Sequence, residues 1–479
     1  MKVTTVNATN QTQQTKFKTS FKGMGLSPLS NALYTLGNND MLNASFVDIF
    51  AMDTPRTIVE FNNRGKQAGI EMGFREYTGT FIAEFSAITF ASLASKIFSK
   101  GFKPETKINS STWVTNNGID TFSEIYKNSD KTPFGFVKDS LKSMSGLSGK
   151  ETKIFENEEQ INTIASKFVD VVKNENIDNK TEKKLLVEIQ NDIINALKAD
   201  NNITLKSNGK SFSDNLSHVV RDIADVSKNV FFKPGVNSAE AISKIKSLNN
   251  TRIATAIPLS MALALSNQYV NRQWTKARTG IDNFVGENNY EKNVESKNSI
   301  KEEKGLLLKK VASAGVFMLM LSKVMGIKKP ADIVKKLEFN GPATGGNAIK
   351  TIYGTLILGR IFASKDSTEL RETNVRDYLG FLNWLVFGGF VAKGVANILD
   401  KGQKNLFNVS KDGKGILHWL KDVSLKSQKE IIAQGGDVKK NLAKLNFAQI
   451  AGIGYSALML GVLLPKLNIW MTRHQDKNK

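Results

Sequence analysis

Charged residues at helical spacing are the densest group of chemically active side chains in this chain. Arg56, Glu60 and Arg64 follow one another at intervals of four residues, and Glu71 and Arg75 have the same interval. Residues spaced in this way lie on one face of a helix, where opposite charges attract. We interpret both sets as structural ion pairs along the solvated side of an amphipathic helix at a membrane interface.

Four further charged residues stand inside apolar runs and are candidates for intramembrane or interfacial charges: Glu84, Lys323, Arg360 and Lys393. Ionisable side chains held in lipid are costly and tend to be functional. Two interpretations of Glu84 are open. Its helix lies at the interface with the carboxylate in water, or the carboxylate pairs with Arg360 or Lys323 inside a bundle. We expect the interfacial arrangement.

Sequence motifs for catalysis, metals and cofactors are not found. The chain has no cysteine and three histidines, which argues against thiolate and histidine metal sites. Segment 145–150 lacks the first glycine and the final hydroxyl residue of a phosphate loop. Segment 341–347 is typical of an anion site at a helix N-terminus or, as we prefer, of a tight turn. We therefore expect no catalytic residue, no metal, no cofactor and no enzymatic activity.

The basic charge is concentrated in the second half of the chain. The net charge is +21, and residues 251–479 hold 35 Lys and Arg against 18 Asp and Glu. Lysine outnumbers arginine 55 to 11, whereas specific nucleic-acid recognition relies on bidentate arginine. We expect the partner to be membrane lipid, of anionic type, because the excess lies beside the apolar runs. We expect no specific nucleic acid.

Six apolar segments are candidates for membrane-embedded helices, since a span needs about 20 mainly apolar residues. The two strongest, 445–465 and 253–271, contain no charged residue. The weaker ones are 378–399, 311–322, 78–98 and 351–363. The predicted fold is all-α: a helical integral membrane protein with four to six membrane-embedded helices and a soluble helical domain inserted after the first.

Small residues at intervals of four inside these runs favour close helix pairing in lipid. Four such stripes are present in the sequence: Ala87, Ala91 and Ser95; Ala256, Ser260 and Ala264; Gly388, Ala392 and Ala396; and Ala448, Gly452 and Ser456. Together they favour a packed bundle over isolated membrane anchors.

The predicted organisation has four parts. Residues 1–39 form a disordered polar tail, and 40–100 hold an amphipathic helix and the first apolar segment. Residues 101–250 form a soluble, charge-balanced helical domain, and 251–479 form a membrane-embedded region with basic loops. Within 101–250, apolar periodicity predicts helices near 161–172, 185–197 and 216–230, and Asn157 with Gln160 fits a capping box.

The function that this pattern favours is that of a non-enzymatic bacterial integral membrane protein, placed in the inner (cytoplasmic) membrane. It would present the 101–250 domain to a protein partner and its basic loops to anionic lipid. The alternative is a secreted membrane-inserting effector or pore-forming protein, supported by a leader without acidic residues. A transporter ranks third, because no inverted repeat is visible. The orientation of the spans stays open.

Overall fold

The computed structural model describes residues 27–100, 109–146, 158–174, 177–197, 202–280, 303–327, 329, 331–341, 343–409 and 423–477. Over these residues the chain is mainly helical, as the all-α prediction requires, with five short strands in two small sheets. The predicted capping residue Asn157 lies outside the described residues. Helix α1 (Pro28–Gly37), which Ser27 caps, corrects the prediction that the whole of 1–39 is disordered.

Seven helical segments in the described part of the chain make up a bundle. In chain order they are segment 1, α2 (Asp40–Phe46), η1 (Val47–Asp53) and α3 (Thr54–Arg64); segment 2, α4 (Lys66–Phe81), η2 (Ile82–Ser86) and α5 (Ala87–Lys100); segment 3, α11 (Ser238–Thr279); segment 4, α12 (Leu306–Met325); segment 5, α14 (Gly346–Ala363); segment 6, α15 (Ser367–Leu382), η5 (Asn383–Phe387) and α16 (Gly388–Leu399); and segment 7, α19 (Val438–Ser456), η6 (Ala457–Leu463) and α20 (Leu464–Lys477). The η elements are π-helical turns within otherwise continuous helices.

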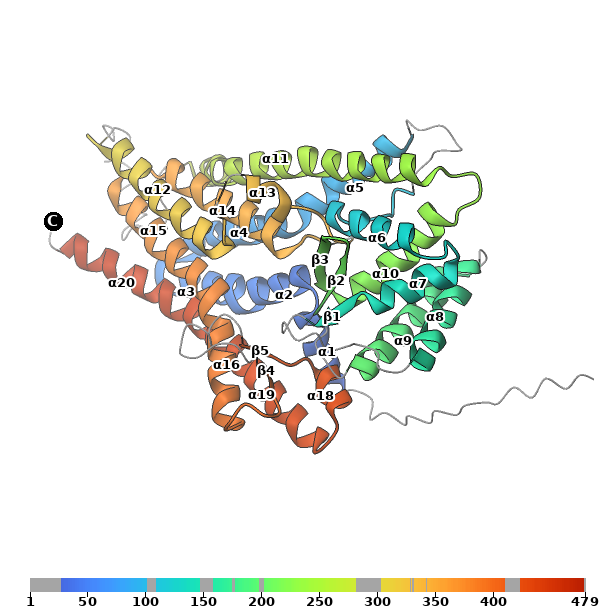
Figure 1. Cartoon of the computed structure of the whole chain (residues 1–479). Coiled ribbons are helices and arrows are strands. Elements are labelled where there is room, and N and C mark those ends of the chain that lie inside the picture. Colours follow the sequence, from blue (N-terminus) through green and yellow to red (C-terminus); the bar gives the residue numbers. More distant parts are fainter. Residues whose placement is uncertain are drawn as a thin grey trace, which may run out of the picture.

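Hydrogen bonds at one end of the bundle bring together the ends of segments 1, 3, 5 and 7 and the starts of segments 2, 4 and 6. Consecutive segments therefore run in opposite directions (Figure 1). At what we call the distal end, Lys309 Nζ donates to Ser367 Oγ (2.8 Å), Lys310 Nζ to the Phe362 carbonyl (3.0 Å), Arg371 Nη2 to Thr472 Oγ1 (2.7 Å), Arg473 Nη2 to the Asn63 carbonyl (2.9 Å) and Arg278 to Gln67. These contacts bring together the end or the start of every segment.

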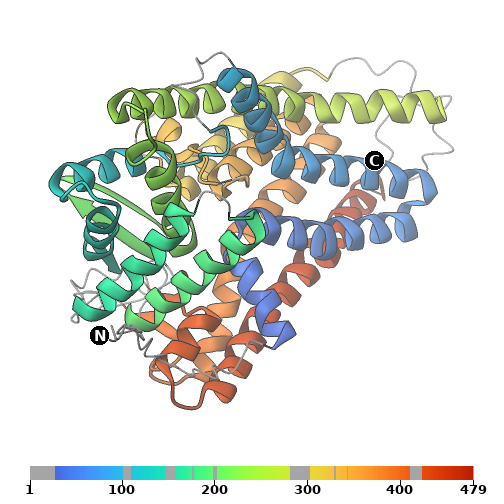
Figure 2. The same cartoon turned by 90° about the vertical axis from the view of Figure 1, so that its right-hand side faces the viewer.

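The opposite end, the domain end, carries the 101–250 region. The backbone N–H of Asn116 donates to Glu338 Oε2 (3.1 Å), and Asn340 donates to Asp214. Asn215 Nδ2 donates to Asn38 Oδ1 (2.9 Å), just before segment 1 begins. The inserted region therefore packs against one end of the bundle, with α11 reaching from its core to the distal end. Figure 2 shows α11 along the top of the molecule above the segment 2 helices.

The 101–250 region has its own hydrophobic core, which extends from Val114 to Leu248. Its elements are α6 (Asn116–Asn128), α7 (Pro133–Lys142), β1 (Met144–Gly146), α8 (Glu158–Lys173), α9 (Asn179–Leu197), β2 (Asn202–Ser207), β3 (Lys210–Asn215), α10 (Leu216–Val226) and η4 (Ser227–Phe231). The six apolar residues that predicted the 161–172 helix are all buried on α8. The antiparallel sheet β1-β2-β3 adds strands to a region predicted to be helical.

The remaining elements lie at the domain end. They are α13 (Ala331–Lys336), between segments 4 and 5, and the antiparallel pair β4 (Phe407–Val409) and β5 (Val423–Leu425) with α18 (Gln428–Gln434), between segments 6 and 7.

Segments 2 and 6 repeat the same design. Each has a 16-residue helix, a five-residue π-helical turn and a second helix, and their sequences match in register. The first helix has Glu71, Arg75-Glu76-Tyr77 and Gly79 in segment 2, and Glu372, Arg376-Asp377-Tyr378 and Gly380 at the corresponding positions of segment 6. The small-residue stripes also correspond, from Ala87, Ala91 and Ser95 to Gly388, Ala392 and Ala396. Segments 2 and 6 thus form an internal repeat.

The small-residue stripes lie where the helices approach most closely. A Cβ added to Gly452 would lie 2.9 Å from the Gly388 carbonyl and 3.0 Å from Ala392 Cβ, so the stripes of α19 and α16 face each other. The stripes on α5 and α11 are also buried, and these two helices pack along each other. Each half of the repeat therefore uses its stripe to pack against the long helix that follows it.

Two helices in the described part of the chain are long and apolar enough to cross a membrane, Lys66–Lys100 and Val438–His474. The second contains the predicted segment 445–465. The first contains 78–98, which the sequence ranks among the weaker candidates, whereas the favoured 253–271 lies within α11, which is not one of the two. Pro258, Asn267 and Gln268 lower the apolarity of α11, and the two amides are buried.

Candidate functional site: a buried charge network

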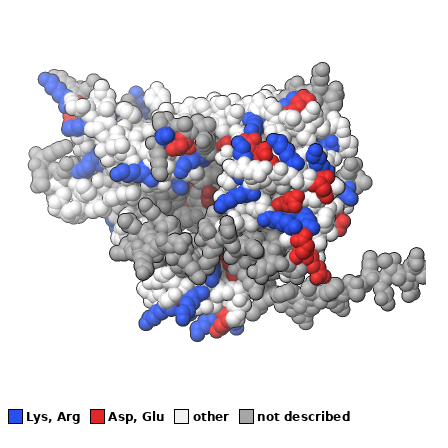
Figure 3. All heavy atoms as spheres, in the orientation of Figure 1, with Lys and Arg blue, Asp and Glu red and all other residues white. Residues whose placement is uncertain are grey.

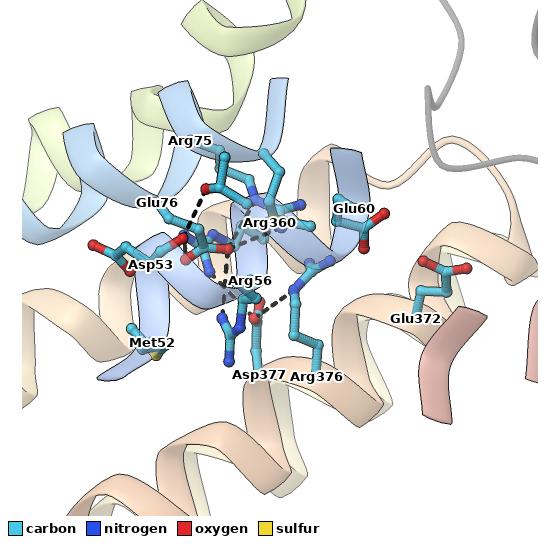
Figure 4. Close-up of polar contacts among 12 residues, drawn as sticks. Met52, Asp53, Arg56, Glu60, Arg75, Glu76, Arg360, Glu372, Arg376 and Asp377 are labelled. Atoms are coloured by element: carbon cyan, nitrogen blue, oxygen red, sulfur yellow. Dashed lines mark hydrogen bonds and ion pairs between the residues drawn. The ribbon is translucent and has the colours of Figure 1, made fainter. Parts of the chain in front are cut away.

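Charged side chains from segments 1, 2, 5 and 6 meet inside the bundle (Figure 4). Glu76 accepts from Arg75 Nη2 at 2.9 Å and from Arg360 Nη2 at 3.3 Å, and Arg56 Nη1 lies 3.5 Å away. Asp377 lies 3.0 Å from Arg376 Nε and 3.2 Å from Arg360 Nη1. All six side chains are buried. Arg360 therefore bridges the two carboxylates of the repeated Arg-acid pairs.

A second group lies closer to the distal end. Arg64 makes a two-pronged contact with Glu372, Nη2 to Oε1 at 2.5 Å and Nη1 to Oε2 at 3.2 Å, and its Nη1 also lies 3.3 Å from Glu60. Thr472 donates to Glu372 as well. This group ties the end of segment 1 to the start of segment 6 and the end of segment 7.

Four buried carboxyls of this region, Glu71 and three others, have no ion pair among the described residues. Asp53 accepts from Thr80 Oγ1 at 2.8 Å, and Asp48 and Glu84 lie within hydrogen-bonding reach of each other. Both Asp48 and Glu84 are 0 % exposed. They lie in η1 and η2, and π-helical turns of this kind occur often at functional sites.

The predicted ion-pair residues are close together, but in the interior and not on a solvated side. Arg56, Glu60 and Arg75 are all at most 3 % exposed, which is the opposite of the interfacial helix that we expected. Of the spacings that were predicted, only the Glu60–Arg64 pair forms as a direct contact between neighbours on one helix. Glu71 is also buried. These charged residues are buried because segment 1 is packed on several sides by segments 2 and 7.

The four candidate charges have separate surroundings. Glu84 is buried, so the water-exposed arrangement is wrong, and its neighbours are Ser45 and Asp48, not Arg360 or Lys323. Arg360 is a central member of the network. Lys323 is exposed on α12. Lys393 is half-buried, with its ammonium 6.0 Å from the centre of the Phe390 ring.

Sequence reasoning missed Glu372, Arg376 and Asp377, which are three of the nine charged residues in the two groups. They come from a segment some 300 residues after Glu76, so helical spacing alone cannot connect them. The signal that could have found them is the match between Arg75-Glu76-Tyr77 and Arg376-Asp377-Tyr378.

The two glycine-rich segments have structural roles. The N–H of Gly346, at the start of α14, donates to Asp40 Oδ2 at 2.9 Å, so the protein's own carboxylate occupies the position considered for an anion. Met144–Gly146 forms the edge strand β1, and residues 147–150 lie outside the described residues.

No cluster of three or more Asp, Glu or His side chains able to hold a metal is found among the described residues. The site is thus a set of ion pairs and unpaired carboxyls. Comparisons of this chain with protein-family models, with curated proteins and with solved structures find no match.

Proposed function

We propose that this chain is a helical integral membrane protein whose seven-segment bundle lies in lipid and whose 101–250 region lies in water. The observation that carries the proposal is the apolar exterior of the bundle. Arginines and carboxylates lie in its interior beside a hydrophobic core, while large hydrophobic side chains such as Phe81, Leu319 and Trp470 are 56–69 % exposed on its outside. Such an exterior needs a partner that is itself apolar.

The 101–250 region serves as an internal comparison. Among its described residues, Val187 is the one large hydrophobic side chain that is exposed, whereas segments 1 to 7 expose many. Figure 3 shows acidic and basic side chains interspersed over the 101–250 region on the right, while acidic side chains are sparse over the bundle on the left. One chain therefore carries two kinds of surface, and the boundary between them follows the boundary of the bundle.

The two shortest segments are long enough to cross a bilayer. Segment 4 has 20 residues and segment 5 has 18; at about 1.5 Å per residue these span about 30 Å and 27 Å, close to the hydrocarbon thickness. With seven crossings, one more than the six predicted candidates, the distal and domain ends lie on opposite sides. The additional crossing is segment 1, which the sequence does not predict as a span because its charged residues lower its hydropathy.

The proposed role is non-enzymatic. The 101–250 region presents a water-exposed surface to a protein partner, and lysines at the ends of the segments contact anionic lipid headgroups, each contributing about 1 kcal/mol. The bacterial inner membrane is the proposed location. The alternative, a water-soluble pore-forming effector, fits less well, because such a protein has to hide its apolar helices before insertion.

Extraction of membranes with alkaline carbonate tests this proposal. We expect the chain to stay in the membrane pellet and to be released by mild detergent, which separates insertion from aggregation. Recovery in the carbonate supernatant would contradict the proposal.

A further inference from the structure

We propose that Asp48 and Glu84 form a proton-binding site inside the bundle, in which the two carboxyl groups share a proton in the folded protein. This inference goes beyond the proposed function, because insertion in a membrane does not require a titrating group. It concerns two neighbouring carboxyls of the buried polar network that have no arginine in contact among the described residues.

The hydrogen bonds around Ser45 are both formed when Glu84 carries a proton. Ser45 Oγ lies 2.8 Å from the Met41 carbonyl and also contacts Glu84 Oε2, and it can donate to either group. A hydroxyl has one proton to donate. When Ser45 donates to the Met41 carbonyl, a protonated Glu84 makes the second contact a hydrogen bond by donating to Ser45.

The contact between Asp48 and Glu84 leads to the same conclusion. Two ionised carboxylates in hydrogen-bonding reach repel each other and have no donor between them, whereas one shared proton turns the contact into a strong hydrogen bond. Both oxygens of Asp48 and Oε1 of Glu84 are buried and receive no hydrogen bond from a described group. Without a proton, these atoms would pay the full cost of burial.

Among the described residues, the neighbouring elements supply no cation in contact with this pair. Along segment 1, Asp53 adds negative charge, and Arg56 attracts Asp48 from a distance but lies against Glu76 and donates to the Leu460 carbonyl. Segment 5 contributes Tyr353, and segment 7 faces η1 with η6, which has no ionisable residue. The ionisable group that segment 2 places beside Asp48 is Glu84 itself, the other member of the pair.

A comparison of segments 2 and 6 shows which buried charges the two halves of the repeat share and which they do not. The residues corresponding to Glu71, Arg75 and Glu76 in segment 6 are Glu372, Arg376 and Asp377, so the arginine network is a shared feature of both halves. At the position of Glu84, segment 6 has Leu385. A carboxyl that is present in one half alone is not needed to build the helix pair, so a different role has to account for its burial.

A metal ion is a less suitable occupant. The site offers two carboxyls and the hydroxyl of Ser45, and no group of three acidic or histidine ligands is found in the described residues. Calcium takes six to eight oxygen ligands. A proton satisfies both carboxyls with no further ligand.

Infrared spectroscopy of the purified full-length protein in detergent tests the proposal. We expect a carbonyl band of protonated carboxylic acid at neutral pH, part of which is lost in Glu84→Gln and in Asp48→Asn, while the part that belongs to Asp225 remains. Both variants are neutral isosteres of the protonated group, so we expect them to fold. Glu303→Gln, at the distal end, is the matched control and should leave the band unchanged.

The result that would overturn the proposal is a neutral-pH spectrum without such a band, or a band unchanged in both variants. Loss of the band on addition of sodium or calcium chloride at constant pH would assign the site to a metal cation and would equally overturn it. If neither variant folds, the spectra of Asp225→Asn, which lacks the Asp225 contribution, still decide with and without these salts. Failure of carbonate extraction affects the membrane proposal and leaves these spectra interpretable.

Discussion

At the scale of single residues, Glu76 holds the network together, because it is the carboxylate that three arginines approach from three different segments. Removing one partner of a buried ion pair leaves the others desolvated and unpaired. The two Arg-acid pairs of the repeat are joined through Arg360, so the loss of one carboxylate affects both halves.

We predict that Glu76→Gln lowers the free energy of unfolding by about 3–5 kcal/mol. Denaturation in detergent measures this change. Glu124→Gln is the control, since Glu124 pairs with Lys127 on the surface of α6, and an exposed pair contributes about 0.2–1 kcal/mol. Equal effects of the two substitutions would contradict a buried network.

A second residue-scale prediction concerns Asp225, a half-buried side chain on α10, in the 101–250 region. Burial and then the nearby Asp222 carboxylate raise the pKa of Asp225 from 3.8 to about 7. The folded state therefore binds a proton that the unfolded state releases, so the stability contribution is present in acid and is lost as pH rises towards 7.

We expect Asp225→Asn to raise the free energy of unfolding at pH 8 by about 1–2 kcal/mol and to have little effect at pH 4. Thermal unfolding at both pH values measures the difference. Asp170→Asn, on the exposed face of α8, should have no effect at either pH. A gain at pH 4 that equals the gain at pH 8 would be inconsistent with the raised pKa.

At the scale of elements, the close approach of α16 and α19 depends on Gly452. An added Cβ would meet the Gly388 backbone at 2.9 Å, whereas nothing lies within 4 Å of a Cβ added to Gly454 on the same helix. We predict that Gly452→Ala destabilises the protein by about 1–3 kcal/mol, since overpacking forces backbone shifts.

Gly454→Ala is the matched control and should stabilise by up to about 1 kcal/mol through helix propensity. Unfolding midpoints of the two variants give the comparison. A Gly452→Ala variant as stable as the control would show that the helices have room to move apart.

The elements also show which features of the sequence are informative. The period of apolar residues located α8 and α9, and the small-residue stripes located the close helix contacts. The hairpin β2-β3 was missed, although Asn208-Gly209 between Ile203, Leu205 and Phe212 is a turn signal of two-residue hairpins. Segment 1 was assigned to the interface, because its buried face carries charges where a soluble helix would carry leucines.

At the scale of the whole molecule, the mainly helical fold could be predicted from the sequence, and the network residues of segment 6 could not. Helical spacing predicted that Arg56, Glu60 and Arg64 share one helix face and that Glu71 and Arg75 share another. It said nothing about which residues of segments 5 and 6 would meet them. These contacts are set by the tertiary structure, and the sequence reflects them only through the repeated Arg-acid-Tyr motif. The burial of the network follows from the packing of segments 1, 2, 5 and 6 around it, which periodicity alone does not reveal.

The central claim, that the bundle crosses a membrane with its two ends on opposite sides, is tested most directly by cysteine accessibility. The chain has no cysteine of its own, so single substitutions can be labelled without background. Suitable positions are Lys304→Cys at the distal end, Lys184→Cys on α9 of the 101–250 region and Leu319→Cys midway along α12; all three side chains are exposed. The probe is a membrane-impermeant maleimide, applied to sealed vesicles.

The account predicts that the Lys304 and Lys184 positions react from opposite sides of the vesicle membrane. The Leu319 position should stay unlabelled from both sides until detergent is added, because lipid covers it. Labelling of all three positions from one side of intact vesicles would contradict the account.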